Sequence, residues 1–421
     1  MKAASFRIAM YSHDTYGLGH LTRTLRLARA TVEELPGASV LILTGSPVAH
    51  RFEFPPRVDY VKLPSVVKSA PETYEPRDLR ISSRAVRAIR ATIIRNTLAL
   101  FRPHLFLVDN APVGMKGELL SALLALKDAD PAARICLNLR DVLDTPSEIL
   151  RSWTESGAIR VLRHLYDAIH VFGSPEVYDA VAAYHLPADK SFSLGYIPPF
   201  PDEQLPGESS LPPAEPGRSR ILVTTGGGGD GQEIVRCVLE LQRSLGVRSP
   251  YLFHVITGPF MNAEGREMVA RTSKEIEGVT LHEHVDHLPS WMADCDLVLS
   301  MGGYNTLCEV MASARRSVVV PRIHPRREQE IRAHALERRG LLKVLDPRAL
   351  DARSLNGTLR LVLDEVPCIP AACRPPLTGT ARFQEMLRGY LCPADAPLLL
   401  LQGGRRRTGP EGGAIWKSPQ R

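Results

Sequence analysis

The sequence predicts an α/β protein built from two doubly wound domains. Short apolar segments typical of β-strands alternate with amphipathic helical segments along most of the chain. The alternation stops at one stretch dense in proline and glycine and then starts again. A chain of 421 residues is also too long for one ordinary core. Apolar strands that are separated by helices form parallel sheets covered on both faces.

The first block of alternation covers residues 1–197, where we expect a Rossmann-like domain. Helical periodicity separates most of its predicted strands, most clearly over 21–35 and 116–128. The predicted strands are 6–12, 39–45, 58–64, 104–110, 134–140, 168–173 and 191–197.

Residues 198–219, PPFPDEQLPGESSLPPAEPGRS, are predicted to be a linker. A second Rossmann-like domain is expected over 220–365, with strands at 220–225, 251–258, 279–285, 296–301, 317–321 and 341–345. Residues 366–391 form an extension that includes a predicted final helix, and 392–421 have the composition of a disordered tail. Because ligands bind outside the carboxyl ends of parallel strands, we expect the two domains to face each other across a substrate cleft.

Composition and charge exclude several functional classes. The chain is 44% hydrophobic and 23% charged and has no apolar stretch long enough to cross a bilayer, so we expect a cytoplasmic protein. Its seven scattered cysteines form no C-x-x-C pair and predict reduced thiols. The net charge of +6 comes mostly from arginines that are spread along helices without aromatic neighbours, which disfavours nucleic-acid binding. An anionic substrate or a membrane surface fits this balance better.

One helical segment, 79–101, combines arginines with an apolar stripe. A helix packed on the core by that stripe is the favoured interpretation, and a helix that lies on the inner face of a membrane is the alternative.

Four loop-and-helix motifs carry the candidate chemistry, and each follows a predicted strand. The first is GLGHLTR, with Gly17, Gly19, His20 and Arg23. The helix dipole disfavours a charged imidazole at a helix start, so His20 is expected to be neutral and able to accept a proton. A histidine that merely packs at the helix start is the alternative.

The second motif is the run of glycines Gly226, Gly227, Gly228 and Gly229, between a strand and a helix. Glycines in a row have little use in packing, whereas bare backbone N–H groups at a helix start bind phosphate. The segment lacks both the P-loop and the dinucleotide fingerprint. A plain turn is the alternative.

The third motif is MGGYNTLCE. Here Gly302 and Gly303 free a second helix start for phosphate, and Asn305 and Thr306 add side-chain donors. Glu309 lies about one turn further on, where a carboxylate can accept both hydroxyls of a ribose. An exposed helix acid is the alternative for Glu309.

The fourth motif, at a strand-to-helix turn, contains Arg326, Arg327, Glu328 and Gln329. The Gln329 side chain both donates and accepts hydrogen bonds, which suits a sugar. For the individual arginines we favour a solvated helix face. Asp109 ends another predicted strand at the same cleft and is a second catalytic candidate.

Together these motifs resemble a known family. GxGHxxR at 17–23, the glycine loop at 226–229, GGxNTxxE at 302–309 and Glu-Gln at 328–329 occur in this order across the two blocks. The set is similar to that of the family 28 glycosyltransferases of the GT-B fold, whose two Rossmann-like domains face each other across a cleft. The resemblance covers residues 6–364 and is strongest over 284–345.

The resemblance implies a glycosyltransferase that moves a hexosyl or N-acetylhexosaminyl group. The donor would be a nucleoside diphosphate sugar, usually a UDP-sugar, and the reaction would be inverting, with no metal and no tightly bound cofactor. The C-terminal domain would bind the donor. In it, the two glycine motifs would hold the diphosphate, Glu309 the ribose, Gln329 beside Glu328 the sugar, and the His284–Val285 turn the base.

The N-terminal domain would then bind the acceptor, a small molecule or a lipid-linked group, at a loop that includes His13, Gly17, Gly19 and Arg23. His20 would face the anomeric carbon, and Asp14 would orient the imidazole, contact substrate or only form an Asx turn.

The chain also departs from the family pattern. Its loop HDTYGLGH lacks the glycine-rich GGTGGH of the lipid II-forming members, so the acceptor stays open. The pattern GxGHxxRxxxLA at 17–28 is also similar to the nucleotide-sugar hydrolase of the pseudaminic acid pathway, in which water replaces the acceptor. A nucleotide-sugar hydrolase and a non-catalytic nucleotide-sugar binding protein therefore remain as alternatives.

Overall fold

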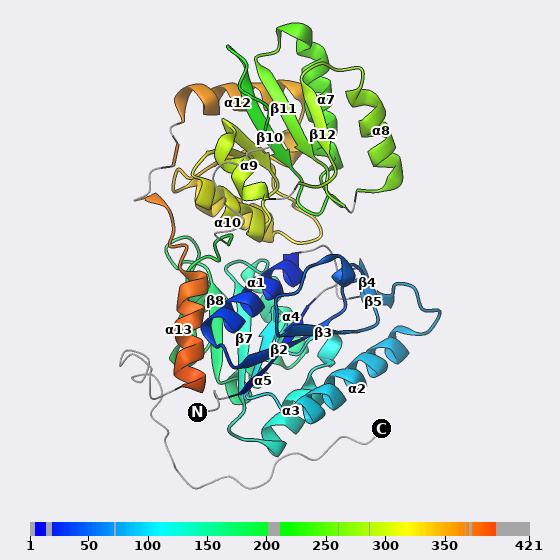
Figure 1. The fold of residues 1–421 in the computed structure, drawn as a ribbon, viewed down its shortest axis with the longest axis vertical. Coiled ribbons are helices and arrows are strands. Elements are labelled where there is room, and N and C mark those ends of the chain that lie inside the picture. Colours follow the sequence, from blue (N-terminus) through cyan, green and yellow to red (C-terminus); the bar gives the residue numbers. More distant parts are fainter. Residues whose placement is uncertain are drawn as a thin grey trace.

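The computed structural model contains two α/β domains, one above the other in Figure 1. It describes residues 5–13, 19–70, 73–200, 211–259, 261–285, 287–366, 368–369 and 373–392. In this part of the chain, no helix is both long and apolar enough to cross a membrane. The predicted α/β class with two parallel sheets is confirmed.

The N-terminal sheet has the strand order β3-β2-β1-β6-β7-β8-β9, and all of its neighbouring strands are parallel. The order reverses direction between β1 and β6, which is the topological switch point where ligands bind. Each of the seven segments predicted as strands contributes one strand. They are β1 (Phe6–Ser12), β2 (Ala38–Thr44), β3 (Val58–Lys62), β6 (Leu105–Asp109), β7 (Arg134–Arg140), β8 (Ala168–Phe172) and β9 (Ser191–Ser193).

Alternation along β1 divides the N-terminal core between the two faces of the sheet. Ile8 and Met10 pack with α1, whereas Ala9 and Tyr11 pack on the face covered by α2 and α3. The helices are α1 (Gly19–Glu34), α2 (Ser83–Phe101), α3 (Leu120–Ala129), α4 (Pro146–Glu155), α5 (Ala158–His164) and α6 (Ala180–Ala183). The sequence analysis did not predict the antiparallel hairpin of β4 (Val66–Ala70) and β5 (Thr73–Pro76).

The C-terminal sheet repeats the same parallel order, β12-β11-β10-β13-β14-β15, with its switch point between β10 and β13. Its strands are β10 (Ser219–Thr224), β11 (Tyr251–Ile256), β12 (Val279–His282), β13 (Leu297–Ser300), β14 (Arg316–Val319) and β15 (Lys343–Val344). Its helices are α7 (Gln232–Leu245), α8 (Ala263–Ser273), α9 (Leu288–Asp294), α10 (Tyr304–Ser313), α11 (Glu328–Glu337) and α12 (Ala352–Glu365).

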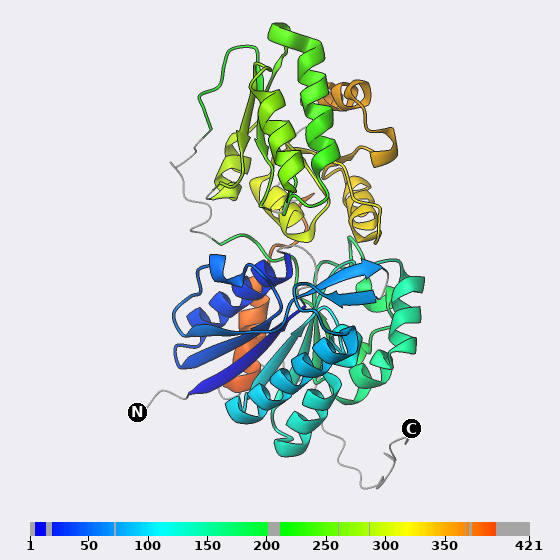
Figure 2. The same ribbon diagram turned by 90° about the vertical axis from the view of Figure 1, so that its right-hand side faces the viewer.

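The last helix, α13 (Gly379–Leu391), returns to the N-terminal domain and lies along α1 (Figures 1 and 2). Arg388 pairs with Glu34 at 2.6 Å, and Gln384 Nε2 donates to the Ala30 carbonyl at 3.2 Å. The sequence predicted this helix but not its place. Most of the predicted tail, 393–421, and the linker residues 201–210 lie outside the described residues.

A continuous apolar cluster joins the two domains. The residues that pack around α1 also contact Tyr304 and Leu307 of α10 and Leu336 of α11. The carboxyl ends of both sheets face this boundary, so the expected position of the cleft agrees with the fold.

Candidate active site between the two domains

The two glycine motifs of the C-terminal domain lie together at the end of its sheet. Gly226 follows β10, and Gly303 follows β13, the strand on the other side of the switch point. A methyl group on either glycine would lie close to Thr306 Oγ1, at 3.9 Å from Gly226 and 3.8 Å from Gly303. The Thr306 hydroxyl therefore lies between the two loops, which form one backbone-lined surface.

Two glycines of the first loop, Gly226 and Gly228, are required for different structural reasons. Gly226 is exposed with a φ of +63°, so it turns the chain and leaves the backbone bare. Gly228 also has a positive φ, but a side chain there would collide with the carbonyl of Thr257. The expectation that these glycines have little use in packing is therefore wrong for Gly228, because the neighbouring loop lies against it.

The start of α1 in the N-terminal domain meets the start of α10 in the C-terminal domain (Figure 1). Asn305 Nδ2 donates to the Gly19 carbonyl at 3.2 Å, and a methyl group on Gly19 would lie 3.9 Å from the same nitrogen. This contact places His20, the second residue of α1, beside the helix that carries Thr306 and Glu309.

His20 is held by Asp109, which ends β6. The distance from His20 Nδ1 to Asp109 Oδ2 is 2.5 Å, and Arg23 pairs with the other oxygen. Arg23 was assigned to the acceptor loop, but it is buried and lies over the Tyr304 ring at 5.7 Å. Its role in the structure is therefore to hold Asp109.

The charge states follow from this arrangement. Burial favours a higher pKa for Asp109, but Arg23 and His20 outweigh it, so the pKa of this carboxyl lies well below its ordinary value. Burial lowers the pKa of His20, although Asp109 opposes the shift. His20 is thus neutral at pH 7. Because Asp109 accepts a hydrogen bond at Nδ1, the proton resides there and Nε2 keeps its lone pair.

A buried chain of side chains lies behind this pair. The His13 ring lies 5.9 Å from the His20 ring, nearly perpendicular to it, and its Nδ1 is 3.2 Å from the Tyr11 hydroxyl. Tyr11 donates to Glu118 at 2.7 Å, and Arg90 holds both oxygens of Glu118 at 2.7 Å. Because the Tyr11 hydroxyl donates its proton to Glu118, the Tyr11 oxygen accepts a hydrogen bond from His13 Nδ1. Burial lowers the pKa of His13, so that ring is neutral too.

Glu309 lies at the domain boundary, and its carboxylate pairs with Arg26 of α1 at 2.7 Å. Their side chains are only 10% and 7% exposed, so the interpretation as an exposed helix acid is wrong. Nothing in the sequence singles out Arg26 among the arginines of that helix.

Glu328 and Gln329 begin α11 at the same edge of the sheet. Gln329 Oε1 accepts from the backbone N–H of Arg322 at 3.1 Å, and Glu328 Oε1 accepts from the Arg322 side chain at 2.5 Å. Glu328 Oε2 is buried and has no hydrogen-bond partner within the described residues. A hydroxyl group of a ligand would satisfy it.

A buried ion pair ties the domains together beside these residues. Arg332 of α11 binds Asp141 of the N-terminal domain at 2.8 Å and also donates to the Gly302 and Val142 carbonyls at 3.1 and 3.0 Å. Tyr196 donates to the same carboxylate at 3.0 Å. The sequence analysis missed this pair, because its members are 191 residues apart.

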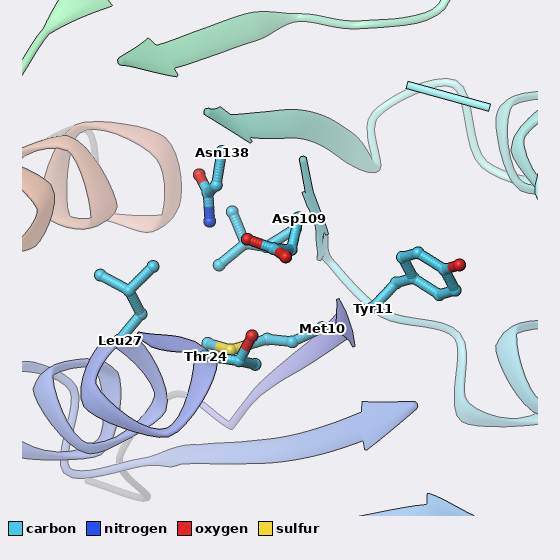
Figure 3. Close-up of a pocket in the computed structure, with 7 residues that line it drawn as sticks. Met10, Tyr11, Thr24, Leu27, Asp109 and Asn138 are labelled. Carbon is cyan, nitrogen blue, oxygen red and sulfur yellow. The ribbon is translucent and has the colours of Figure 1, made fainter. Parts of the chain in front are cut away.

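Other predicted residues are less informative. His284 is exposed and Val285 is half-buried in the loop between β12 and α9. Asp14 and Gly17 lie outside the described residues. A cavity of about 10 Å³ next to Asp109 is large enough for one water molecule but not for a substrate. Figure 3 shows its lining, which is Met10, Tyr11, Thr24, Leu27, Leu107, Asp109 and Asn138.

Comparison with known families concerns the C-terminal domain first. Residues 220–367 match the family described as Glycosyltransferase family 28 C-terminal domain. The chain is 24% identical over 168 residues to a UDP-N-acetylglucosamine--N-acetylmuramyl-(pentapeptide) pyrophosphoryl-undecaprenol N-acetylglucosamine transferase of Finegoldia magna. That match covers 39% of this chain and 45% of the relative, so the chain spans less than half of the relative's length.

Solved structures share the whole architecture. The calicheamicin glycosyltransferase CalG4 is 15% identical with a TM-score of 0.61, over 94% of this chain and 100% of that one. A putative UDP-N-acetylglucosamine 2-epimerase of Listeria monocytogenes is 13% identical with a TM-score of 0.62, over 94% of this chain and 98% of that one. At such identity the likeness concerns the fold, and it confirms two Rossmann-like domains in the GT-B arrangement.

Proposed function

Residues 220–367 are a glycosyltransferase family 28 C-terminal domain, as the sequence motifs indicated, and from this premise we propose that the protein is a glycosyltransferase. It transfers a sugar from a nucleoside diphosphate sugar, most simply a UDP-sugar, to an acceptor hydroxyl or amine. The observation that carries the proposal is the meeting of the two domains. The start of α10, which follows the second glycine motif, meets the start of α1, which carries His20 beside Asp109, through the Asn305–Gly19 hydrogen bond.

The donor would lie on the C-terminal domain. Backbone N–H groups beside Gly226 and Gly303 would bind the diphosphate, with the Thr306 hydroxyl between them. Glu309 would accept the ribose hydroxyls, and the unpartnered Glu328 Oε2 with Gln329 would bind the sugar. The base would rest near His284 and Val285. Helix starts supply positive potential to the diphosphate, so no metal ion is needed in this scheme.

His20 would act as the general base. Nε2 accepts the proton of the acceptor hydroxyl, the acceptor oxygen bonds to the anomeric carbon, and the bond from that carbon to the diphosphate breaks as UDP leaves. Attack opposite the leaving group inverts the anomeric configuration. Asp109 holds Nδ1–H and stabilises the imidazolium that forms, so it is a positioning residue, as is Arg23.

A peripheral contact with the inner face of a membrane belongs to the same proposal. α2 buries Val86, Ile94 and Leu98 against the domain but leaves other apolar side chains exposed. Ile89 of α2, with Leu79 and Ile81 in the segment before it, is among the apolar side chains that are between 40% and 48% exposed, and exposed arginines lie nearby at 77, 80 and 84. Apolar side chains amid cations suit an anionic lipid surface and a lipid-linked acceptor.

The test is to incubate the protein with a panel of nucleotide sugars and measure release of UDP, dTDP or GDP, with and without an acceptor pool. A transferase releases nucleotide only when acceptor is present. If free sugar is released when no acceptor is present, the protein is a nucleotide-sugar hydrolase and not a transferase. Nucleotide affinity without turnover on any pair would identify a binding protein.

A further inference from the structure

The arginines that face the domain boundary differ in one respect, which is whether they have an anionic partner. Most are paired with carboxylates. These pairs are Arg23–Asp109, Arg26–Glu309, Arg322–Glu328, Arg322–Asp230 and Arg332–Asp141. Arg140 makes no hydrogen bond or ion pair with any described residue, and its Nε is fully enclosed without a partner.

The position of Arg140 is fixed by the N-terminal sheet. It is the last residue of β7, and Asn138 of the same strand lies opposite Asp109 in register. Residues two apart on a strand share a face, so Arg140 lies one step beyond Asp109 on the side of Asn138. Its charge acts on His20. Arg140 therefore lies at the carboxyl end of the N-terminal sheet, where the two domains meet, near the proposed base.

The surroundings of Arg140 come from both domains. The charges that act on it are those of Arg23 and Asp109 in the N-terminal domain and of Glu328 and Arg332 in the C-terminal domain. Burial, with the positive charge of Arg23, lowers its pKa to about 10, so the guanidinium is still positive at pH 7. Arg140 is half-buried with its Nε enclosed, and a partly desolvated cation beside two other cations is costly for a protein to keep.

Of the nearby carboxylates, Asp109 and Asp141 are already engaged, whereas Glu328 attracts Arg140 but forms no ion pair with it. Asp109 binds His20 and Arg23, and Asp141 binds Arg332 and Tyr196. A second arginine lies two residues before the start of α11. Arg326 is half-buried, makes no ion pair with a described residue, and its charge acts on both His13 and Glu328.

We propose that Arg140, with Arg326 of the other domain, forms an anion subsite that binds phosphate or carboxylate oxygens of a substrate beside His20. A guanidinium binds such groups through two parallel hydrogen bonds, which suits a site that must orient its ligand. The inference rests on the proposed function for what the substrate is. The anion is then either the diphosphate of the donor or an acidic group on the acceptor.

The first experiment measures the Tm of the ligand-free protein. Arg140→Met removes an unpaired charge, so the Tm should equal or exceed that of the wild type. A Tm that falls by several degrees would show that Arg140 has a structural partner and would overturn the proposal. Arg160→Gln, at an exposed position of α5, is the control and should leave the Tm unchanged.

The second experiment measures binding by calorimetry. If the subsite binds the donor diphosphate, Arg140→Met should weaken the binding of UDP at least about tenfold and leave the binding of uridine unchanged. If it takes an acceptor anion, UDP binding is unchanged, and inorganic phosphate binds to the UDP-saturated wild type but not to the variant. Arg140→Lys, which keeps the charge, should restore part of either effect. Affinities within about twofold of wild type for both UDP and phosphate would overturn the subsite.

Failure of the proposed function is distinguishable. If the wild type binds no UDP, the proposed donor is wrong, and pyrophosphate alone becomes the probe. Pyrophosphate binding that Arg140→Met abolishes would uphold the anion subsite without the transferase. A wild type that binds neither UDP nor pyrophosphate would overturn both.

Discussion

At the scale of single residues, the account depends on how Asp109 sets the state of His20. Burial favours a lower pKa for His20, whereas Asp109, whose Oδ2 lies 2.5 Å from His20 Nδ1, favours a higher one. Burial prevails, so His20 is ready to accept a proton at pH 7. The same carboxylate stabilises the imidazolium that appears during turnover.

Replacing Asp109 with asparagine should therefore change both the rate and its pH dependence. Burial would then lower the pKa of His20 without opposition, so the acid limb of the kcat–pH profile should move to lower pH. The plateau should fall about 100-fold or more, because the imidazolium loses its counter-ion. Steady-state kinetics from pH 5 to 8 measure both effects. Asp128→Asn, an exposed position on α3, is the control. An acid limb that stays in place or moves to higher pH would contradict the account.

Glu309 should govern recognition of the ribose. Glu309→Gln removes the negative charge that accepts both hydroxyls, so the Kd for UDP should rise about tenfold. Titration with 2′,3′-dideoxy-UDP checks the cause, since the wild type should prefer UDP and the variant should not. Arg26→Met breaks the ion pair between the domains but keeps the carboxylate, so it should retain the preference. If Glu309→Gln still prefers UDP to the dideoxy analogue, Glu309 does not bind the ribose hydroxyls.

The sequence singled out individual candidate residues but not the contacts between them. Gly19, His20, Gly303, Asn305 and Thr306 stand out because glycine and polar residues at a helix start have few other uses. Their predicted chemical roles remain predictions. The pairings of His20 with Asp109 and of Arg26 with Glu309 were missed, although Asp109 and Glu309 were candidates themselves, because side chains 89 and 283 residues apart meet only after folding.

At the scale of elements, the strands were the most predictable part. The central strands of the two parallel sheets, such as β6 and β13, are short apolar runs, because both faces of those sheets are covered. The β4–β5 hairpin was missed because its sequence, VVKSA and TYEP, lacks such a run. The packing of α13 on α1 could not be predicted, because a helical pattern does not indicate which domain the helix packs against.

The exposed apolar side chains of α2 and the turn before it should bind anionic membranes. The triple variant Leu79→Ser, Ile81→Ser, Ile89→Ser should lower binding to vesicles that contain an anionic lipid about tenfold or more, because it removes apolar area from the lipid contact. Co-sedimentation measures the binding, and the Tm should stay unchanged. Val247→Ser on the C-terminal domain is the matched control. Equal binding by the triple variant and the control would refute the contact.

At the scale of the whole molecule, two buried neutral histidines make stability depend on pH. Burial lowers the pKa of His170 to about 3 and that of His254 to about 4, from an ordinary value near 6.5. Below pH 6.5 the unfolded chain binds protons that the folded one refuses. The stabilising contribution is thus complete above pH 6.5 and is lost as the pH falls, by about 1.4 kcal/mol per pH unit for each group.

His254→Leu should reduce this sensitivity, since neither His254 nitrogen has a hydrogen-bond partner within the described residues. Between pH 7 and pH 5, the Tm of the variant should fall less than that of the wild type. Parallel Tm curves would show that His254 is protonated in the folded protein and would contradict the burial argument.

The central claim for the whole molecule is that one domain binds the nucleotide and the other supplies the base. The most direct test compares His20→Ala with the wild type, measuring UDP release from the active donor by kinetics and UDP affinity by calorimetry. The account predicts that turnover falls about 100-fold or more while the Kd for UDP stays within about twofold. Undiminished turnover in His20→Ala would contradict it.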